Sequence, residues 1–296
     1  MIDSLHDVTL LQGQARRIET RCGAGALVWH VWGAADRPPV LLLHGGSGSW
    51  THWLQNILSL VQAGWQVLVP DMPGFGDSAA PPDGEDADVL PAWLEAGLQQ
   101  LIGNTALPVV GFSFGGLVAG LWTQQAPTRI SRLVLVGSPC LSAERLQPLD
   151  LRRWDGTPAG PARDALHRHN LLQLMLAHEA SATPLAVALH AANVERDRLR
   201  RRRLMLTDAL VPLLPTLACP VQGIWGSEDA LYRHRLPLIG RVLRTAPRFE
   251  SLRLLPGAGH WVAFEAAAGF NAALLGMLGA AGQSGQQTLS RRQTLR

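Results

Sequence analysis

Short apolar runs that end in glycine or polar residues constrain the fold of this chain more than any other feature of its sequence. A short run that is apolar throughout and bounded by turn residues is typical of a strand buried on both faces of a sheet. These runs alternate with longer stretches of helical spacing, which predicts an α/β fold with a mainly parallel sheet and helices on both faces. The expected buried strands are Pro39–Leu43, Gln66–Val69, Pro108–Gly111, Leu133–Val136, Val221–Trp225 and Ser251–Leu255, after an antiparallel strand at Ala26–Trp32. The expected helices are Trp50–Val61, Val89–Ile102, Phe114–Gln125 and Val262–Leu278.

The composition excludes several classes of protein. Of the 296 residues, 47% are hydrophobic and 17% charged, which is the balance of a globular protein rather than of a disordered chain. No apolar run approaches the roughly 20 residues of a membrane-spanning helix, and the mixed, acidic first residues are unlike a secretory signal. Three cysteines are too few and too scattered for a disulfide framework or a zinc site. We therefore expect a cytoplasmic protein.

The spacing of the expected strands divides the chain into a core and an insertion. Strand-like runs stop after Val136 and resume at Val221, and the intervening segment has helical patterns at Ala165–Ala177 and Pro184–Leu206. A helical insertion between two strands is expected to cover the carboxyl edge of the sheet, where open α/β sheets bind ligands. We therefore predict a core of residues 1–140 and 215–280, a helical lid of residues 141–214, and a disordered tail at 281–296.

The strongest candidate for chemistry is a G-x-S-x-G motif between an expected strand and an expected helix. The sequence Gly111-Phe112-Ser113-Phe114-Gly115 places glycines on both sides of the serine, and a tight strand-to-helix turn of this kind projects the hydroxyl into the cleft. The motif also occurs by chance as a glycine-rich turn. Its significance therefore depends on whether the chain supplies a base and an acid.

The chain supplies both partners in the order that this topology requires. A serine hydroxyl needs a base to take its proton, and the base needs an acid that holds its tautomer. Asp229 follows the strand that ends near Trp225, and His260 follows the last strand, directly before the terminal helix. Glu228 competes with Asp229, but we favour Asp229 because the first acidic residue of such a turn normally points away from the site. The predicted catalytic residues are Ser113, Asp229 and His260.

Two backbone amides are expected to stabilise the negative charge that develops on a substrate carbonyl oxygen. One is the amide of Phe114, at the start of the helix that follows the serine. The other lies in the loop His44-Gly45-Gly46-Ser47-Gly48, where Gly46 is the best candidate because small residues allow close approach of a substrate.

Arginine is the basic residue throughout this chain, which contains no lysine and has a formal net charge of +3. Six arginines fall in Arg196–Arg203. Such a run can form a nucleic-acid patch, but no aromatic interleaving or binding motif accompanies it, and a solvated helix face is the simpler interpretation. One possibility stays open, namely that one of these arginines turns inward toward a substrate carboxylate.

Together these motifs resemble the α/β-hydrolase fold family, in the form of a single core with a helical cap. The resemblance covers roughly Val28–Leu278. It implies that the D-x-P-G-x-G-x-S segment is a structural turn, and it identifies the fold far better than the substrate. The motifs that carry it are His44-Gly45-Gly46, Asp71-Met72-Pro73-Gly74-Phe75-Gly76-Asp77-Ser78, Gly111-Phe112-Ser113-Phe114-Gly115-Gly116, Trp225-Gly226-Ser227-Glu228-Asp229 and Gly259-His260.

The nucleophile narrows the activities that the resemblance implies. Haloalkane dehalogenases and epoxide hydrolases of this family have an aspartate where this chain has Ser113, which leaves acyl transfer to water and C–C bond hydrolysis. The aromatic Trp261 after the base resembles the C–C hydrolases, whose lid arginine holds a substrate carboxylate; Arg196 and Arg198 are the candidates here. Phe112 departs from that group, which has an asparagine before the nucleophile, and the glycine loop is shorter.

We therefore expect a hydrolase that cleaves a carboxylic ester of a small-molecule substrate and uses no cofactor or metal. C–C hydrolysis of 2-hydroxy-6-oxo-dienoate ring-cleavage products is the alternative. A ligand-binding protein with little or no turnover is a third possibility, which the intact triad and glycine loop disfavour. The sequence gives no indication of oligomeric state and none of a nucleic-acid partner.

Overall fold

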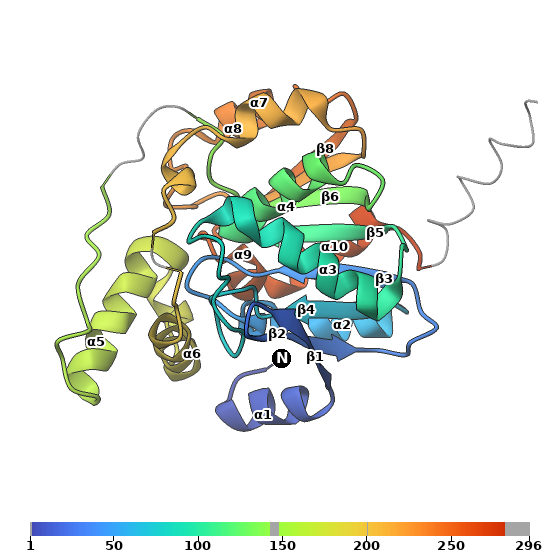
Figure 1. Cartoon of the computed structure of the whole chain (residues 1–296). Coiled ribbons are helices and arrows are strands. Elements are labelled where there is room, and N and C mark those ends of the chain that lie inside the picture. Colours follow the sequence, from blue (N-terminus) through green and yellow to red (C-terminus); the bar gives the residue numbers. More distant parts are fainter. Residues whose placement is uncertain (1, 143–147, 200, 282–296) are drawn as a thin grey trace, which may run out of the picture.

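Eight strands form one sheet in the computed structural model, which describes residues 2–142, 148–199 and 201–281 (Figure 1). The strand order is β1-β2-β4-β3-β5-β6-β7-β8. The β1–β2 and β2–β4 pairs are antiparallel and the pairs from β4 through β8 are parallel, which confirms the predicted fold class. The strands are β1 (Arg16–Cys22), β2 (Gly25–Trp32), β3 (Pro39–Leu43), β4 (Gln66–Pro70), β5 (Leu107–Phe112), β6 (Ile130–Val136), β7 (Val221–Gly226) and β8 (Phe249–Leu255).

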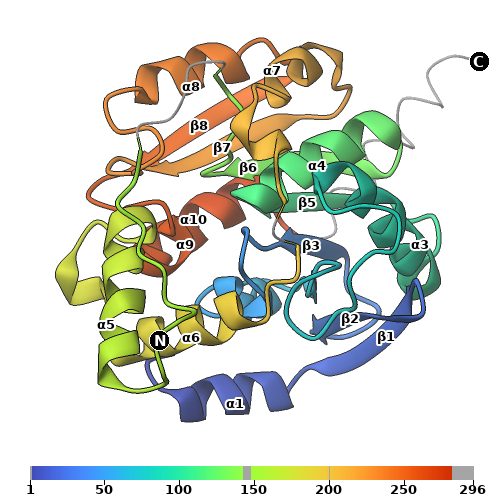
Figure 2. The ribbon, with the colours of Figure 1, turned by 60° about the vertical axis from the view of Figure 1, so that its left-hand side comes forward.

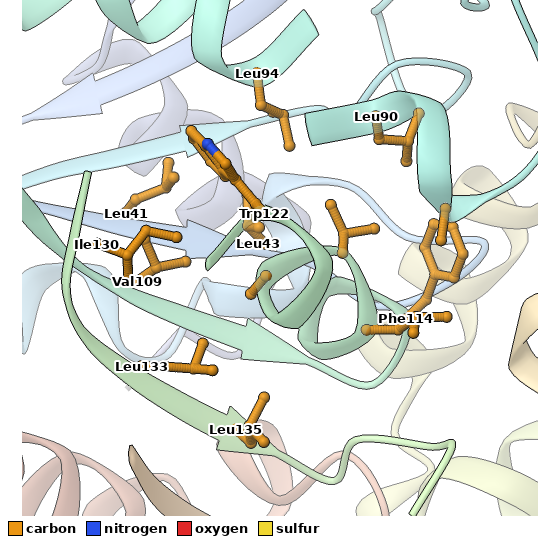
Figure 3. Close-up of a cluster of buried hydrophobic side chains, with 14 of the residues drawn as sticks. Leu41, Leu43, Leu90, Leu94, Val109, Phe114, Trp122, Ile130, Leu133 and Leu135 are labelled. Carbon is orange, nitrogen blue, oxygen red and sulfur yellow. The ribbon is translucent and has the colours of Figure 1, made fainter. Parts of the chain in front are cut away.

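The central strands are apolar throughout because each of their faces contacts a hydrophobic core. In β3, Leu41 and Leu43 belong to the core formed with α3 and α4, part of which Figure 3 shows. Val40 and Leu42 belong to the opposite core, formed with α1, α2 and α10. The helices are α1 (Leu5–Gly13), α2 (Ile57–Gln62), α3 (Leu90–Ile102), α4 (Phe114–Gln125), α5 (Pro161–Asn170), α6 (Pro184–Glu195), α7 (Leu210–Leu213), α8 (Leu236–Leu243), α9 (Val262–Glu265) and α10 (Ala267–Leu278).

Several elements differ from the sequence prediction, and helices α1 and α8 were not predicted. Strand β1 was not predicted because it is an edge strand with mostly exposed, polar residues, so it has no apolar pattern. The helix expected at Trp50–Val61 is a 3₁₀ turn, η1 (Trp50–Trp53), followed by α2. The terminal helix is interrupted at Ala266, whose backbone leaves the helical region.

The insertion between β6 and β7 contains two helices that pack on each other. In both ribbon views α5 and α6 lie together, and Figure 1 shows them to one side of the sheet (Figure 1, Figure 2). A π-helical turn, η3 (Leu171–Met175), continues α5. At the end of the predicted insertion, α7 packs on α4, where the Leu210 side chain lies against Gly120.

The helix expected over Pro184–Leu206 ends at Glu195, so the prediction of a long helix was wrong. Residues 196–199 and 201–203 form no helix or strand. The chain leaves the helix because its backbone turns to the core, where the Arg198 amide donates a hydrogen bond to the Gly74 carbonyl at 2.8 Å. The described part of the arginine run is therefore not a solvated helix face.

Cys22, Cys140 and Cys219 are all buried and form no disulfide. Among the described residues, no helix combines the length and the apolar character needed to cross a membrane. Apart from Ala281, the tail predicted to be disordered lies outside the described residues.

Candidate active site

Ser113 occupies a strained turn between β5 and α4. Its backbone has φ 49° and ψ −118°, a left-handed conformation that is rare for a residue with a side chain and is typical of functional sites. The turn is tight enough to require glycine beside it, because a Cβ on Gly115 would lie 2.5 Å from the carbonyl oxygens of Leu43 and His44. This geometry holds the turn that carries Ser113 against the end of β3.

His260 connects Ser113 with Asp229. Its Nε2 lies 2.9 Å from the Ser113 Oγ, and its Nδ1 lies 3.1 Å and 3.0 Å from the two carboxylate oxygens of Asp229. A carboxylate accepts hydrogen bonds and does not donate them, so a neutral His260 carries its proton on Nδ1 and accepts the serine hydroxyl proton with Nε2. All three side chains are buried. This arrangement can remove the hydroxyl proton as the oxygen attacks a carbonyl carbon.

The turns around the histidine explain which carboxylate reaches it. Asp229 is fully buried and is fixed by a 2.9 Å hydrogen bond from the Leu231 amide, whereas the side chain of Glu228 is exposed and lies beside Ser227. A Cβ on Gly137 would lie 3.2 Å from the His260 ring, so a larger residue at position 137 would crowd the pair.

The glycine loop after β3 lies directly beside Ser113. A Cβ on Gly45 would come within 3.3 Å of the Ser113 Cβ. The Gly45 amide is already occupied, since it donates to His52 Nδ1 at 3.2 Å. The Gly46 amide has no acceptor within the part of the chain that the structure describes, and the Phe114 amide, at the first position of α4, has no intrahelical partner. Both amides are thus available to a substrate oxygen.

His52 supports the glycine loop, a role that the sequence did not suggest. Its ring is buried among His44, Phe112 and Trp261, and burial lowers its pKa well below the ordinary histidine value. The imidazole is therefore neutral, and its Nδ1 can accept the Gly45 amide. A histidine inside an apolar stretch gives no sequence signal for this contact.

Glu265 holds the loop that carries His260, and it too escaped the sequence analysis. Its carboxylate accepts hydrogen bonds from the Gly259 amide at 2.7 Å and from the Ala177 and His178 amides of the insertion at 2.9–3.0 Å. The Trp261 amide also donates to the Met175 carbonyl at 2.7 Å. The His260 loop is thereby tied to the insertion.

The two arginines expected to face the site have other partners. Arg196 forms an exposed ion pair with Asp77 at 2.8 Å. Arg198 donates to backbone carbonyls of the 75–78 turn, including Gly76 at 2.9 Å. Both side chains therefore bind the structural turn after β4, and neither is placed at Ser113.

Among the described arginines of the run, Arg202 lies beside the glycine loop. A Cβ on Gly46 would be 3.4 Å from its guanidinium carbon. The guanidinium lies 5.7 Å from the ring centre of Phe114 and donates to Asp197 at 2.7 Å and to the Ser47 hydroxyl at 3.1 Å. The density of arginines drew attention to this run in the sequence. Which of them lies beside the loop depends on the path of the irregular segment after α6, which the sequence does not reveal.

A buried histidine and two aspartates form the group of potential metal ligands that the described residues contain. The donor atoms of His30, Asp71 and Asp77 lie within 4.8 Å of one another. Two of the three already have other partners, because Asp71 accepts the Trp50 and Asp77 amides and Asp77 pairs with Arg196. Such a donor set does not fit a metal centre, and the expectation of metal independence stays a prediction.

The sequence pattern of the family described as "alpha/beta hydrolase fold" matches residues 38–267. The chain therefore belongs to this family and is an enzyme of the hydrolase class, which confirms the predicted class. The match spans the glycine loop, the serine turn, Asp229 and His260.

Known proteins similar to this chain include C–C hydrolases and esterases. It is 27% identical to a 2-hydroxy-6-oxo-6-phenylhexa-2,4-dienoate hydrolase of Burkholderia cepacia, over 84% of this chain and 90% of the relative. A meta-cleavage product hydrolase of Pseudomonas fluorescens matches with a TM-score of 0.72 and 22% identity, over 88% of this chain and 96% of the other. A carboxylesterase of Bacillus subtilis matches with a TM-score of 0.74 and 19% identity, over 92% and 94%. At these identities the two structures share the fold.

Proposed function

We propose that this enzyme is a serine hydrolase in which Ser113 is the nucleophile, His260 the general base and Asp229 the acid that orients it. The observation that carries the proposal is the position of His260, within 2.9 Å of the Ser113 Oγ and 3.0 Å of the Asp229 carboxylate. Ser113 attacks the substrate carbonyl carbon while His260 takes the hydroxyl proton, and His260 then returns this proton to the leaving group. Water attacks the resulting acyl-enzyme, with His260 again as the base.

The amides of Gly46 and Phe114 form the oxyanion hole of this mechanism. The carbonyl oxygen becomes negatively charged during attack, and donors that are already in place stabilise this charge without reorganisation. Phe114 also opens α4, so the positive end of the helix dipole adds to the stabilisation.

The substrate we propose is a carboxylic ester of a small molecule. Arg202, which lies beside the glycine loop, is paired with Asp197, so this pair presents little net charge and suits a neutral acyl group. The insertion acts as a lid in this proposal. Its apolar segment includes Leu171, Met175 and Leu176, all buried, and the Met175 carbonyl contacts the His260 loop.

One observation favours C–C hydrolysis of a 2-hydroxy-6-oxo-dienoate as the second candidate. The Arg202 guanidinium lies beside Gly46. From there it can bind the carboxylate of an acidic substrate while it keeps its hydrogen bond to Asp197. The Burkholderia cepacia relative is named for cleavage of such a dienoate. Phe112, which replaces the asparagine expected before the nucleophile of C–C hydrolases, counts against this candidate.

A comparison of substrates tests the proposal. We expect wild-type enzyme to hydrolyse p-nitrophenyl acetate and butyrate with a higher kcat/KM than a 2-hydroxy-6-oxo-6-phenyl dienoate. Ser113→Ala should reduce kcat by a factor on the order of 10⁴–10⁶ while leaving the circular dichroism spectrum unchanged. Full ester turnover in that variant would exclude Ser113 as the nucleophile.

The variant Arg202→Ala separates the two candidates. The ratio of dienoate to ester kcat/KM should stay constant if the substrate is a neutral ester, since any general damage to the site affects both substrates. A strong preference for the dienoate in wild type, lost in Arg202→Ala but kept in Arg196→Ala, would instead establish the second candidate.

A further inference from the structure

Asp197 is a buried residue of the insertion that contacts the glycine loop. Its Oδ2 accepts a hydrogen bond from the Ser47 hydroxyl at 2.5 Å. The same oxygen forms an ion pair with the Arg202 guanidinium at 2.7 Å. Its Oδ1 accepts the Leu199 amide at 3.0 Å, which fixes the carboxylate within its own segment. Arg202 completes the triangle with a 3.1 Å hydrogen bond to the Ser47 hydroxyl.

Ser47 has an unusual backbone that these contacts hold in place. Its φ of 49° lies in the left-handed region, which a residue with a Cβ adopts only when its surroundings enforce it. Ser47 directly follows Gly46, whose amide has no acceptor among the described residues and faces Ser113 in the proposed mechanism. The peptide that joins the two residues is planar, so the position of Ser47 fixes the position of the Gly46 Cα, the atom that carries this amide.

We propose that Asp197 is a positioning residue for the oxyanion hole, acting through the Ser47 hydroxyl on the backbone of Gly46. This inference rests on the proposed function, because it assumes that the Gly46 amide stabilises the oxyanion. Asp197 belongs to the insertion and Gly46 to the core. The oxyanion hole is therefore complete only when the segment after α6 is seated on the glycine loop.

The neighbouring residue Arg196 provides a matched control. Arg196 and Asp197 lie on the same irregular segment and each connects it to the core, but Arg196 contacts Asp77 in the structural turn rather than the glycine loop. Loss of either contact removes one link between the segment and the core. Only loss of the Asp197 contact also removes a hydrogen bond from Ser47, which then keeps its contact with Arg202.

The experiment measures kcat and KM for p-nitrophenyl butyrate in wild type, Asp197→Ala, Ser47→Gly and Arg196→Ala. Glycine at position 47 tolerates the left-handed backbone, so Ser47→Gly removes the hydroxyl without strain and remains informative if Asp197→Ala folds poorly. The inhibition constant of a trifluoromethyl ketone, which forms an oxyanion adduct with the serine, is measured on the same four proteins.

We expect kcat to fall about tenfold in Asp197→Ala and in Ser47→Gly, with KM within about twofold of wild type, because loss of a whole oxyanion donor costs about 10²–10³ and misplacement costs less. The inhibition constant should rise by the same factor, since the analogue depends on the same hole. Arg196→Ala should match wild type in all three values.

Two results would overturn the inference. One is an unchanged kcat in both Ser47→Gly and Asp197→Ala, and the other is an equal loss in Arg196→Ala, which would indicate a general effect of the segment. Ser113→Ala is assayed alongside: full activity there defeats the proposed function itself, whereas a dead Ser113→Ala with unchanged Ser47→Gly defeats the role of Asp197 alone.

Discussion

Two glycines of α4, Gly115 and Gly120, should respond differently to replacement by alanine. A Cβ on Gly115 would lie 2.5 Å from the carbonyl oxygens of Leu43 and His44, which are backbone atoms that the sheet holds in place. A Cβ on Gly120 would overlap the Cδ2 atom of Leu210, the end of a flexible side chain, with the next Leu210 atom at 3.9 Å. The two substitutions are chemically identical and occur in one helix, so their difference reports what surrounds each site.

The expected magnitudes follow from these contacts. Overpacking against fixed atoms costs about 1–3 kcal/mol, and the gain in helix propensity of up to about 1 kcal/mol offsets it only in part. We expect Gly115→Ala to lower the free energy of unfolding by about 2 kcal/mol on these two principles. In Gly120→Ala the propensity gain and the cost of about 0.5–1.5 kcal/mol for an off-rotamer Leu210 nearly cancel.

Activity should show the same contrast. The atoms that Gly115→Ala displaces begin the glycine loop, and a displacement on the order of 1 Å in such a site costs about 10²-fold in rate. Urea unfolding and ester turnover measured on both variants test this directly. Equal stability and equal turnover in the two variants would refute the claim that close backbone packing sets the site.

Three further predictions concern the acid, metals and pH. Asp229→Asn should lose far more kcat than Glu228→Gln, because Asp229 contacts His260 and Glu228 is exposed. The reverse ranking in ester assays would assign the role of the acid to Glu228 instead. Activity should survive dialysis against EDTA and need no added cofactor, and loss on chelation that one metal restores would contradict a serine mechanism. Burial lowers the pKa of His190 from the ordinary 6.5 to about 4. As the pH falls from 6.5 toward 4, this histidine is protonated in the unfolded chain but not in the folded protein, so the free energy of unfolding decreases. Urea titrations should show His190 contributing about 2 kcal/mol of loss between about pH 8 and pH 5, absent in His190→Gln; an identical loss in that variant would exclude His190 as the source.

The fold class was predictable because it depends on local patterns. A strand buried on both faces must be apolar throughout, and this is visible in Leu133–Val136 without any knowledge of its neighbours. Strand β1 escaped prediction for the opposite reason, because an edge strand exposed on one side needs no apolar pattern. The break at Ala266 has no local signal such as proline or glycine.

Chain order also predicted which residues come together around Ser113, whereas the direction of one turn decided a finer choice. Ser113, Asp229 and His260 each follow a strand, and the carboxyl ends of parallel strands meet at one edge of the sheet, so order and spacing were enough to select them. For Asp229 the choice over Glu228 depended on the direction of a single turn, and the structure places Asp229 at the histidine.

What the sequence by itself determined, then, is the α/β class and the set of side chains that the strand ends bring together, because both arise from short-range periodicity and chain order. Tertiary structure alone decided which arginine of the run approaches the glycine loop. Arg202, rather than Arg196 or Arg198, lies there because the chain leaves α6 at Glu195 and is held by hydrogen bonds to residues more than a hundred positions away, such as Gly74 and Ser47. Contacts between residues so far apart in the chain leave no periodic pattern in the sequence, so they cannot be predicted from it.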